Sequence, residues 1–125
     1  MKKLLILLAG AMMPATFAHA DNGALQDALT LHFIKQNRWA AVSCDMGTDS
    51  DNRTFVYCHP VGDSSFGGVF MVDAEKNEVY PVNGKAIQYT NGARVTLTNG
   101  KPVNVTRWTG DLIDVAHARD TALGN

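Results

Sequence analysis

The sequence predicts an α+β fold, with an N-terminal helix packed on a curled antiparallel β-meander of about seven short strands and a short C-terminal helix. Three observations support this prediction. Apolar residues between positions 24 and 36 recur at helical spacing. From Trp39 onward the apolar period changes to two, which is typical of strands. Finally, Asn-Gly recurs at positions 83–84, 91–92 and 99–100, as expected of successive hairpins.

Residues 1–20 are predicted to be a secretory signal peptide. Two lysines near the start precede the apolar run 4–13, and Ala18-His19-Ala20 fits the small-x-small cleavage pattern. Cleavage between Ala20 and Asp21 would leave a single α+β domain, residues 21–125, that is periplasmic or secreted. No later segment approaches the roughly 20 apolar residues of a membrane span, so none is expected in the mature chain.

The mature chain is mildly acidic and contains two cysteines. Without Lys2 and Lys3 it has nine basic and twelve acidic residues, a net charge of −3. Because no basic stripe is present, nucleic-acid binding is not expected. An oxidising compartment favours a disulfide bond between Cys44 and Cys58.

The first helix is expected over residues 24–36. Its predicted buried face consists of Leu25, Ala28, Leu29 and Phe33. Asn22 can cap the helix and Asn37 with Arg38 can end it. His32 falls within the apolar face, so it should have a hydrogen-bond partner.

Residues 39–46 and 53–60 are predicted to form the first hairpin, and residues 66–73 and 78–82 the second. If Cys44 faces Cys58, the antiparallel register sets Ser43 opposite His59. A four-residue loop, 74–77, joins the second pair and sets Val72 opposite Val79.

Three-residue loops at the Asn-Gly pairs keep the apolar side chains of the following strands on one face. The resulting row across five strands is Val72, Val79, Ile87, Val95 and Val103. The same register sets Ala93 opposite Val105. The other face of the last strands is polar and is the candidate binding surface, formed by Gln88, Arg94, Thr96, Asn104 and Thr106.

A last helix is predicted to begin near Thr109, with Leu112, Ile113 and Ala116 toward the core and a frayed tail after Arg119. Asp111, Asp114 and His117 are spaced three apart on this helix and could together hold a metal ion. A solvated helix face explains the same spacing, and it is the preferred interpretation.

Two further groups could carry chemistry. Ser43, His59 and Asp45 share one face of the first hairpin, as a nucleophile, a base and a carboxylate. No nucleophile-elbow sequence surrounds Ser43, so a polar hairpin face is preferred. The acidic loop containing Asp45, Asp49, Asp51 and Asn52 resembles a calcium loop in composition only, since it lacks the Asp-x-Asp-x-Asp-Gly spacing. No cofactor is expected.

These observations favour a non-enzymatic exported binding module, such as an inhibitor or immunity-type protein acting on an envelope or secreted protein. One alternative is a small envelope enzyme or metal-binding protein that uses Ser43 and His59, or Asp114 and His117. The other is a structural envelope component, which predicts self-association in solution.

Overall fold

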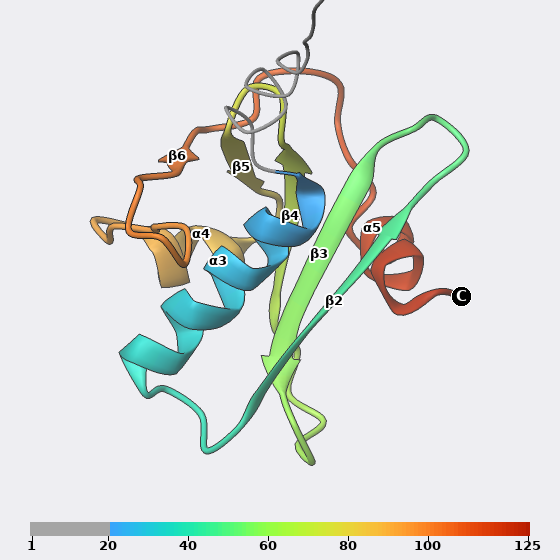
Figure 1. Ribbon diagram of the computed structural model, residues 1–125. Coiled ribbons are helices and arrows are strands. Elements are labelled where there is room, and N and C mark those ends of the chain that lie inside the picture. The colour runs from blue at the N-terminus through green and yellow to red at the C-terminus, as the bar shows by residue number, and fades with distance from the viewer. Residues whose placement is uncertain (1–20) are drawn as a thin grey trace, which may run out of the picture.

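The computed structural model describes residues 21–125, which form helices on both faces of a five-stranded sheet (Figure 1). The predicted signal peptide, residues 1–20, lies outside the described residues. In chain order the elements are α3 (Asn22–Gln36), β2 (Val42–Thr48), β3 (Thr54–Pro60), β4 (Gly68–Asp73), β5 (Glu78–Pro81), α4 (Gly84–Thr90), β6 (Asn104–Val105) and α5 (Val115–Leu123). The predicted α+β class is confirmed, but residues 21–125 form five strands rather than about seven.

The strands β2, β3, β4 and β5 form an antiparallel meander, in which the β2–β3 and β4–β5 pairs have the predicted register. Cys44 lies opposite Cys58, and a disulfide bond joins them. In the second hairpin Val72 lies opposite Val79. The predicted disulfide and the registers of both hairpins are therefore confirmed.

Helix α3 lies across one face of the sheet (Figure 1). All four residues predicted for its apolar face are buried, namely Leu25, Ala28, Leu29 and Phe33. The buried His32 donates from Nε2 to the Tyr89 carbonyl oxygen at 2.8 Å. The Tyr89 carbonyl is therefore the hydrogen-bond partner that was expected for His32, since a buried imidazole without a partner would destabilise the fold.

The ends of α3 are fixed by polar side chains. Asp21 is the N-cap, because its Oδ1 accepts from the Ala24 N–H at 2.8 Å. The prediction that Asn22 caps the helix is therefore wrong by one residue. At the other end Asn37 takes the left-handed conformation, as predicted for the helix stop.

The segment predicted as a strand after the first Asn-Gly pair is the helix α4. Asn83 caps it, since its Oδ1 accepts from the Ala86 N–H at 2.8 Å. The same side chain accepts from Val69 N–H and donates to the Gly67 carbonyl, at 3.1 and 3.0 Å. These bonds join the start of α4 to β4, so Asn83 begins a helix rather than a hairpin turn.

The helical conformation of residues 84–90 overturns two predicted pairings. Ala86 and Tyr89, three residues apart, are buried, whereas Ile87 lies on the other side of α4 and is 55% exposed. Ile87 therefore pairs with neither Val79 nor Val95. The apolar row predicted across five strands is interrupted at this position.

The last Asn-Gly pair does form the predicted turn. The Val103 N–H donates to the Val95 carbonyl at 2.9 Å, and Gly100 has a left-handed φ of 89°. Beyond the turn, however, Val105 pairs in parallel with Val79 at the edge of β5. The predicted pairing of Ala93 with Val105 is therefore wrong, because the chain returns to a strand distant in sequence.

The sheet separates two apolar cores. Along β3, Val56 and Cys58 pack in the core that contains residues of α3 and α4, whereas Phe55 and Tyr57 pack in the core that contains residues of α5. Helix α5 reaches β2 so closely that a Cβ atom at Gly47 would lie 2.0 Å from the Thr121 carbonyl oxygen. Both faces of the central strands are thus covered by helices.

The C-terminal helix begins later than predicted. Asp114 caps α5, accepting from the His117 N–H at 3.2 Å, and the helix continues to Leu123 rather than fraying after Arg119. Because residues 109–114 are not helical, Leu112 is 98% exposed, although Ile113 is buried as predicted. No helix within residues 21–125 is long and apolar enough to cross a membrane.

Candidate binding site

The predicted catalytic group forms only in part. Ser43 lies opposite His59, and His59 Nε2 donates to Asp45 Oδ2 at 2.9 Å. The other ring nitrogen faces the Pro60 carbonyl oxygen at 3.2 Å. Both nitrogens of His59 thus face oxygen acceptors, and neither is directed at the Ser43 hydroxyl. The ring also stacks on Tyr57, with centroids 4.8 Å apart. This arrangement positions His59 and provides no base for Ser43.

The acidic loop is organised around Asp49, whose side chain is 3% exposed. It accepts from the backbone N–H of Arg53 at 2.9 Å, from the Arg53 guanidinium at 2.8 Å and from His117 Nε2 at 3.0 Å. Burial disfavours the charged carboxylate, but these bonds and the Arg53 charge outweigh it and hold the pKa of Asp49 well below its usual range. Asp49 therefore joins the β2–β3 loop to α5.

The residues predicted for a metal site have separate structural partners. The Asp114 side chain caps α5, and the His117 ring bonds to Asp49. At Asp111 the backbone carbonyl accepts from the indole N–H of Trp108 at 2.7 Å. Within residues 21–125, no three His, Cys, Asp or Glu side chains converge as metal ligands.

The polar residues predicted to share one sheet face are dispersed. Gln88 lies on α4, Arg94 and Thr96 lie in the loop before the last turn, and Asn104 is in β6. Thr106 alone among them lines the groove described next. The predicted surface is not a continuous sheet face, because residues 84–90 are helical.

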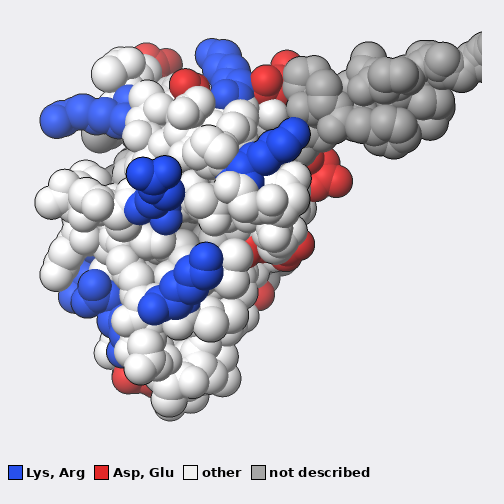
Figure 2. All heavy atoms as spheres, turned by 60° about the vertical axis from the view of Figure 1, so that its left-hand side comes forward, with Lys and Arg blue, Asp and Glu red and all other residues white. Residues whose placement is uncertain are grey.

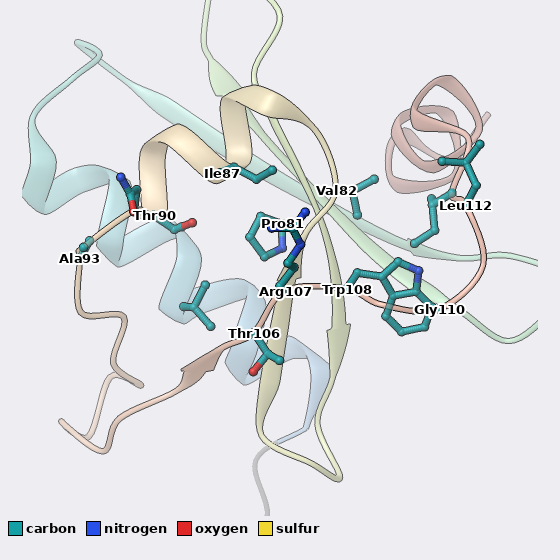
Figure 3. A pocket seen from close by; sticks show the side chains of 14 residues that line it. Pro81, Val82, Ile87, Thr90, Ala93, Thr106, Arg107, Trp108, Gly110 and Leu112 are labelled. Carbon is teal, nitrogen blue, oxygen red and sulfur yellow. The ribbon is translucent and has the colours of Figure 1, made fainter.

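A groove of about 610 Å³ lies between α4, the end of β5 and the segment that follows β6 (Figure 3). This volume is within the roughly 300–1,000 Å³ of small-ligand sites. We refer to it as the groove; it is lined by Pro81, Val82, Ile87, Thr90, Asn91, Gly92, Ala93, Val105, Thr106, Arg107, Trp108, Gly110, Leu112 and Ile113. Its aliphatic residues Ile87 and Leu112 are 55% and 98% exposed.

Trp108 is the aromatic residue of the groove, and its ring is fixed by three contacts. Its indole N–H donates to the Asp111 carbonyl, and its ring packs edge-on against Tyr80 with centroids 5.2 Å apart. At Gly110 a Cβ atom would lie 2.3 Å from the indole, so glycine is needed for the ring to fold back over the chain. The indole is therefore held in place before any ligand binds.

A second cavity of about 690 Å³ also has Trp108 in its wall. It lies near the start of α3, the start of β3 and the turn after β4, and its lining includes Arg53, Lys76, Asp73 and Glu75. Charges of both signs line this cavity. The groove, in contrast, has one charged residue, Arg107, and no carboxylate in its lining.

Ile87 and Leu112 were not predicted to belong to a binding site, and Trp108 was not part of the predicted binding surface. Ile87 and Leu112 were predicted to be buried, because a strand and a helix were expected at their positions. The sequence contains one usable signal for this region: residues 79–110 include no Asp or Glu.

Comparison of the chain with known protein families, with curated proteins and with solved structures finds no match.

Proposed function

We propose that residues 21–125 act after export as a binding protein, of the inhibitor or immunity type, that holds an apolar side chain of a partner protein in the groove. The exposure of Ile87 and Leu112 on its lining, together with the fixed Trp108, carries this proposal. Exposed aliphatic side chains around a concave surface are typical of binding sites. Aromatic residues that are held in place lose little entropy on binding.

The predicted signal peptide and the Cys44–Cys58 disulfide support a localisation outside the cytoplasm. The disulfide lies in the β2–β3 hairpin, within the sheet that carries the groove at its opposite end. A covalently closed hairpin is suited to a protein that must present a rigid surface. The enzyme alternative gains no support from His59, whose ring nitrogens face Asp45 and Pro60.

Photo-crosslinking in the organism that produces the protein tests this proposal. Benzoylphenylalanine would replace Leu112 in one variant and Ile34 in a control, because Ile34 is also 57% exposed but lies on α3, outside the groove. We expect one partner adduct of defined mass from position 112, none from position 34, and loss of the adduct when Trp108→Ala is added.

Three results would contradict the proposal. Equal adducts from positions 112 and 34 would show that the groove has no special role. Persistence of the adduct in the Trp108→Ala background would exclude the indole as an anchor. An adduct of twice the chain mass would favour the structural alternative, in which the partner is a second copy.

A further inference from the structure

We infer, on the basis of the proposed function, that the groove accepts an acidic segment of a partner protein, in which carboxylates flank one large apolar residue. The charge distribution along the chain is the first observation. Residues 79–110, which we call the basic segment, carry Lys85, Arg94, Lys101 and Arg107 and no acidic residue. The rest of residues 21–125 carries five basic and twelve acidic residues, a net charge of −7.

In the folded protein the basic segment is also separated in space from most of the acidic residues. The basic segment supplies α4, the last turn and β6, which lie together at one side of the molecule (Figure 1). Figure 2 shows this side, where basic side chains are spread over an otherwise uncharged surface and acidic side chains lie toward its margins. None of the four basic side chains of the segment forms a salt bridge with another described residue. Their charges are therefore available to a partner.

The groove lies in this basic region and combines two kinds of contact. Arg107 lies among its lining residues, beside apolar Pro81, Val82 and Ile87 (Figure 3). An arginine can hold a carboxylate with two parallel hydrogen bonds, and an apolar cavity favours an aliphatic or aromatic side chain. A peptide segment that carries a carboxylate next to a large apolar side chain could make both kinds of contact in the groove.

A polyanion such as a nucleic acid fits these observations less well. Binding of a phosphate backbone needs several cations along one path. The groove has a single cation, and the part of residues 21–125 outside the basic segment has a net charge of −7, which repels a long polyanion. Asp111 is the acidic residue nearest in sequence to Arg107, but it does not line the groove. It should weaken the attraction of a carboxylate.

Selection of random twelve-residue peptides on the purified, disulfide-bonded protein tests this inference. Peptides that also bind a Leu112→Asn variant would be discarded, which leaves those that depend on the groove and adds no charge that would itself select for acidic peptides. We expect the remaining peptides to be enriched in Asp and Glu beside one large apolar residue. For the best peptide, Arg107→Gln should weaken binding about tenfold and Asp111→Asn should strengthen it about twofold. The matched control Lys35→Gln, on α3, should leave the affinity unchanged.

The outcomes separate this inference from the proposed function. Groove-dependent peptides without acidic enrichment, or an unchanged affinity in Arg107→Gln, would overturn the inference and leave the binding function standing. Absence of any groove-dependent peptide would overturn both. Tighter Arg107-dependent binding of a single-stranded twelve-nucleotide DNA than of the best peptide would overturn the acidic-peptide inference in favour of a nucleic acid.

Discussion

Alanine at position 47 should loosen α5 from the sheet, because its Cβ atom would lie 2.0 Å from the Thr121 carbonyl oxygen. Ordinary van der Waals contact begins at 3.4 Å, so the strand or the helix would have to move by about 1.4 Å. Protein interiors are close-packed, and overpacking of this kind costs about 1–3 kcal/mol. We therefore expect Gly47→Ala to lower the free energy of unfolding by about 1–3 kcal/mol.

Urea denaturation of the purified protein measures this loss, and Gly84→Ala is the matched control. Gly84 is the first residue of α4, and a Cβ atom there meets nothing within 4 Å. Alanine at that position should leave the stability unchanged or raise it by up to about 1 kcal/mol. Trypsin should also cut faster at Arg119 of α5 in Gly47→Ala. Equal urea midpoints for Gly47→Ala and the wild type would refute the close packing of α5 on β2.

Three further predictions concern pH and the disulfide. The pKa of Asp49 is lower in the folded protein than the ordinary 3.8, so its ionisation stabilises the fold above about pH 4. This stabilisation should fade as the pH drops below 4, and the difference in urea midpoint between the wild type and Asp49→Asn should shrink accordingly. Burial and the hydrogen bond to Glu78 raise the pKa of Tyr80 to about 12. Stability should therefore fall as the pH rises from 10 toward 12, by less in Tyr80→Phe than in the wild type, as measured by urea denaturation at several pH values. Cys44 and Cys58 close a loop with a sequence separation of 14. Replacement of both by serine should lower the free energy of unfolding, measured by urea denaturation, by about 3 kcal/mol.

Each of these predictions has a control and a contradicting result. Asp63→Asn changes another carboxylate whose pKa is lowered, but in an exposed turn away from α5, so it should have a smaller effect at neutral pH than Asp49→Asn. A midpoint difference for Asp49→Asn that is the same at pH 6 and pH 2.5 would show that the Asp49 charge adds nothing. Parallel loss of stability in Tyr80→Phe and the wild type above pH 10 would exclude the phenol as the cause. Reductant should lower the wild-type midpoint to that of the double serine variant, and no change on reduction would contradict the stabilising role of the disulfide.

The sequence was sufficient where short-range chemistry determines the structure. The pairing of Cys44 with Cys58 fixes the first register, because opposed residues in an antiparallel pair follow from one contact. Thr98-Asn99-Gly100 forms its expected turn because Gly100 can take a positive φ. The burial of His32 next to a hydrogen-bond acceptor likewise follows from the helical spacing around it.

The sequence was not sufficient where a residue type has two local uses. Asparagine followed by glycine favours a hairpin turn, but asparagine is also a preferred helix N-cap. At Asn83 the choice is made by bonds to Val69 and Gly67, which belong to another element. The candidate site depends on the same choice, since Ile87 lines the groove only because residues 84–90 are helical. Leu112 is exposed because α5 starts at Val115, after a cap at Asp114 that competes with Thr109 as the helix start.

Trp108 connects the two cavities described above, because its indole belongs to the wall of each. A ligand in the groove and a ligand in the second cavity would both contact this one ring. By thermodynamic reciprocity, any effect of the first ligand on the affinity for the second is matched by an equal effect of the second on the affinity for the first. The other tryptophan, Trp39, is stacked on Phe33 beside the core under α3. A change in tryptophan fluorescence when the groove fills would therefore originate at Trp108, which gives any coupling between the two cavities an optical signal.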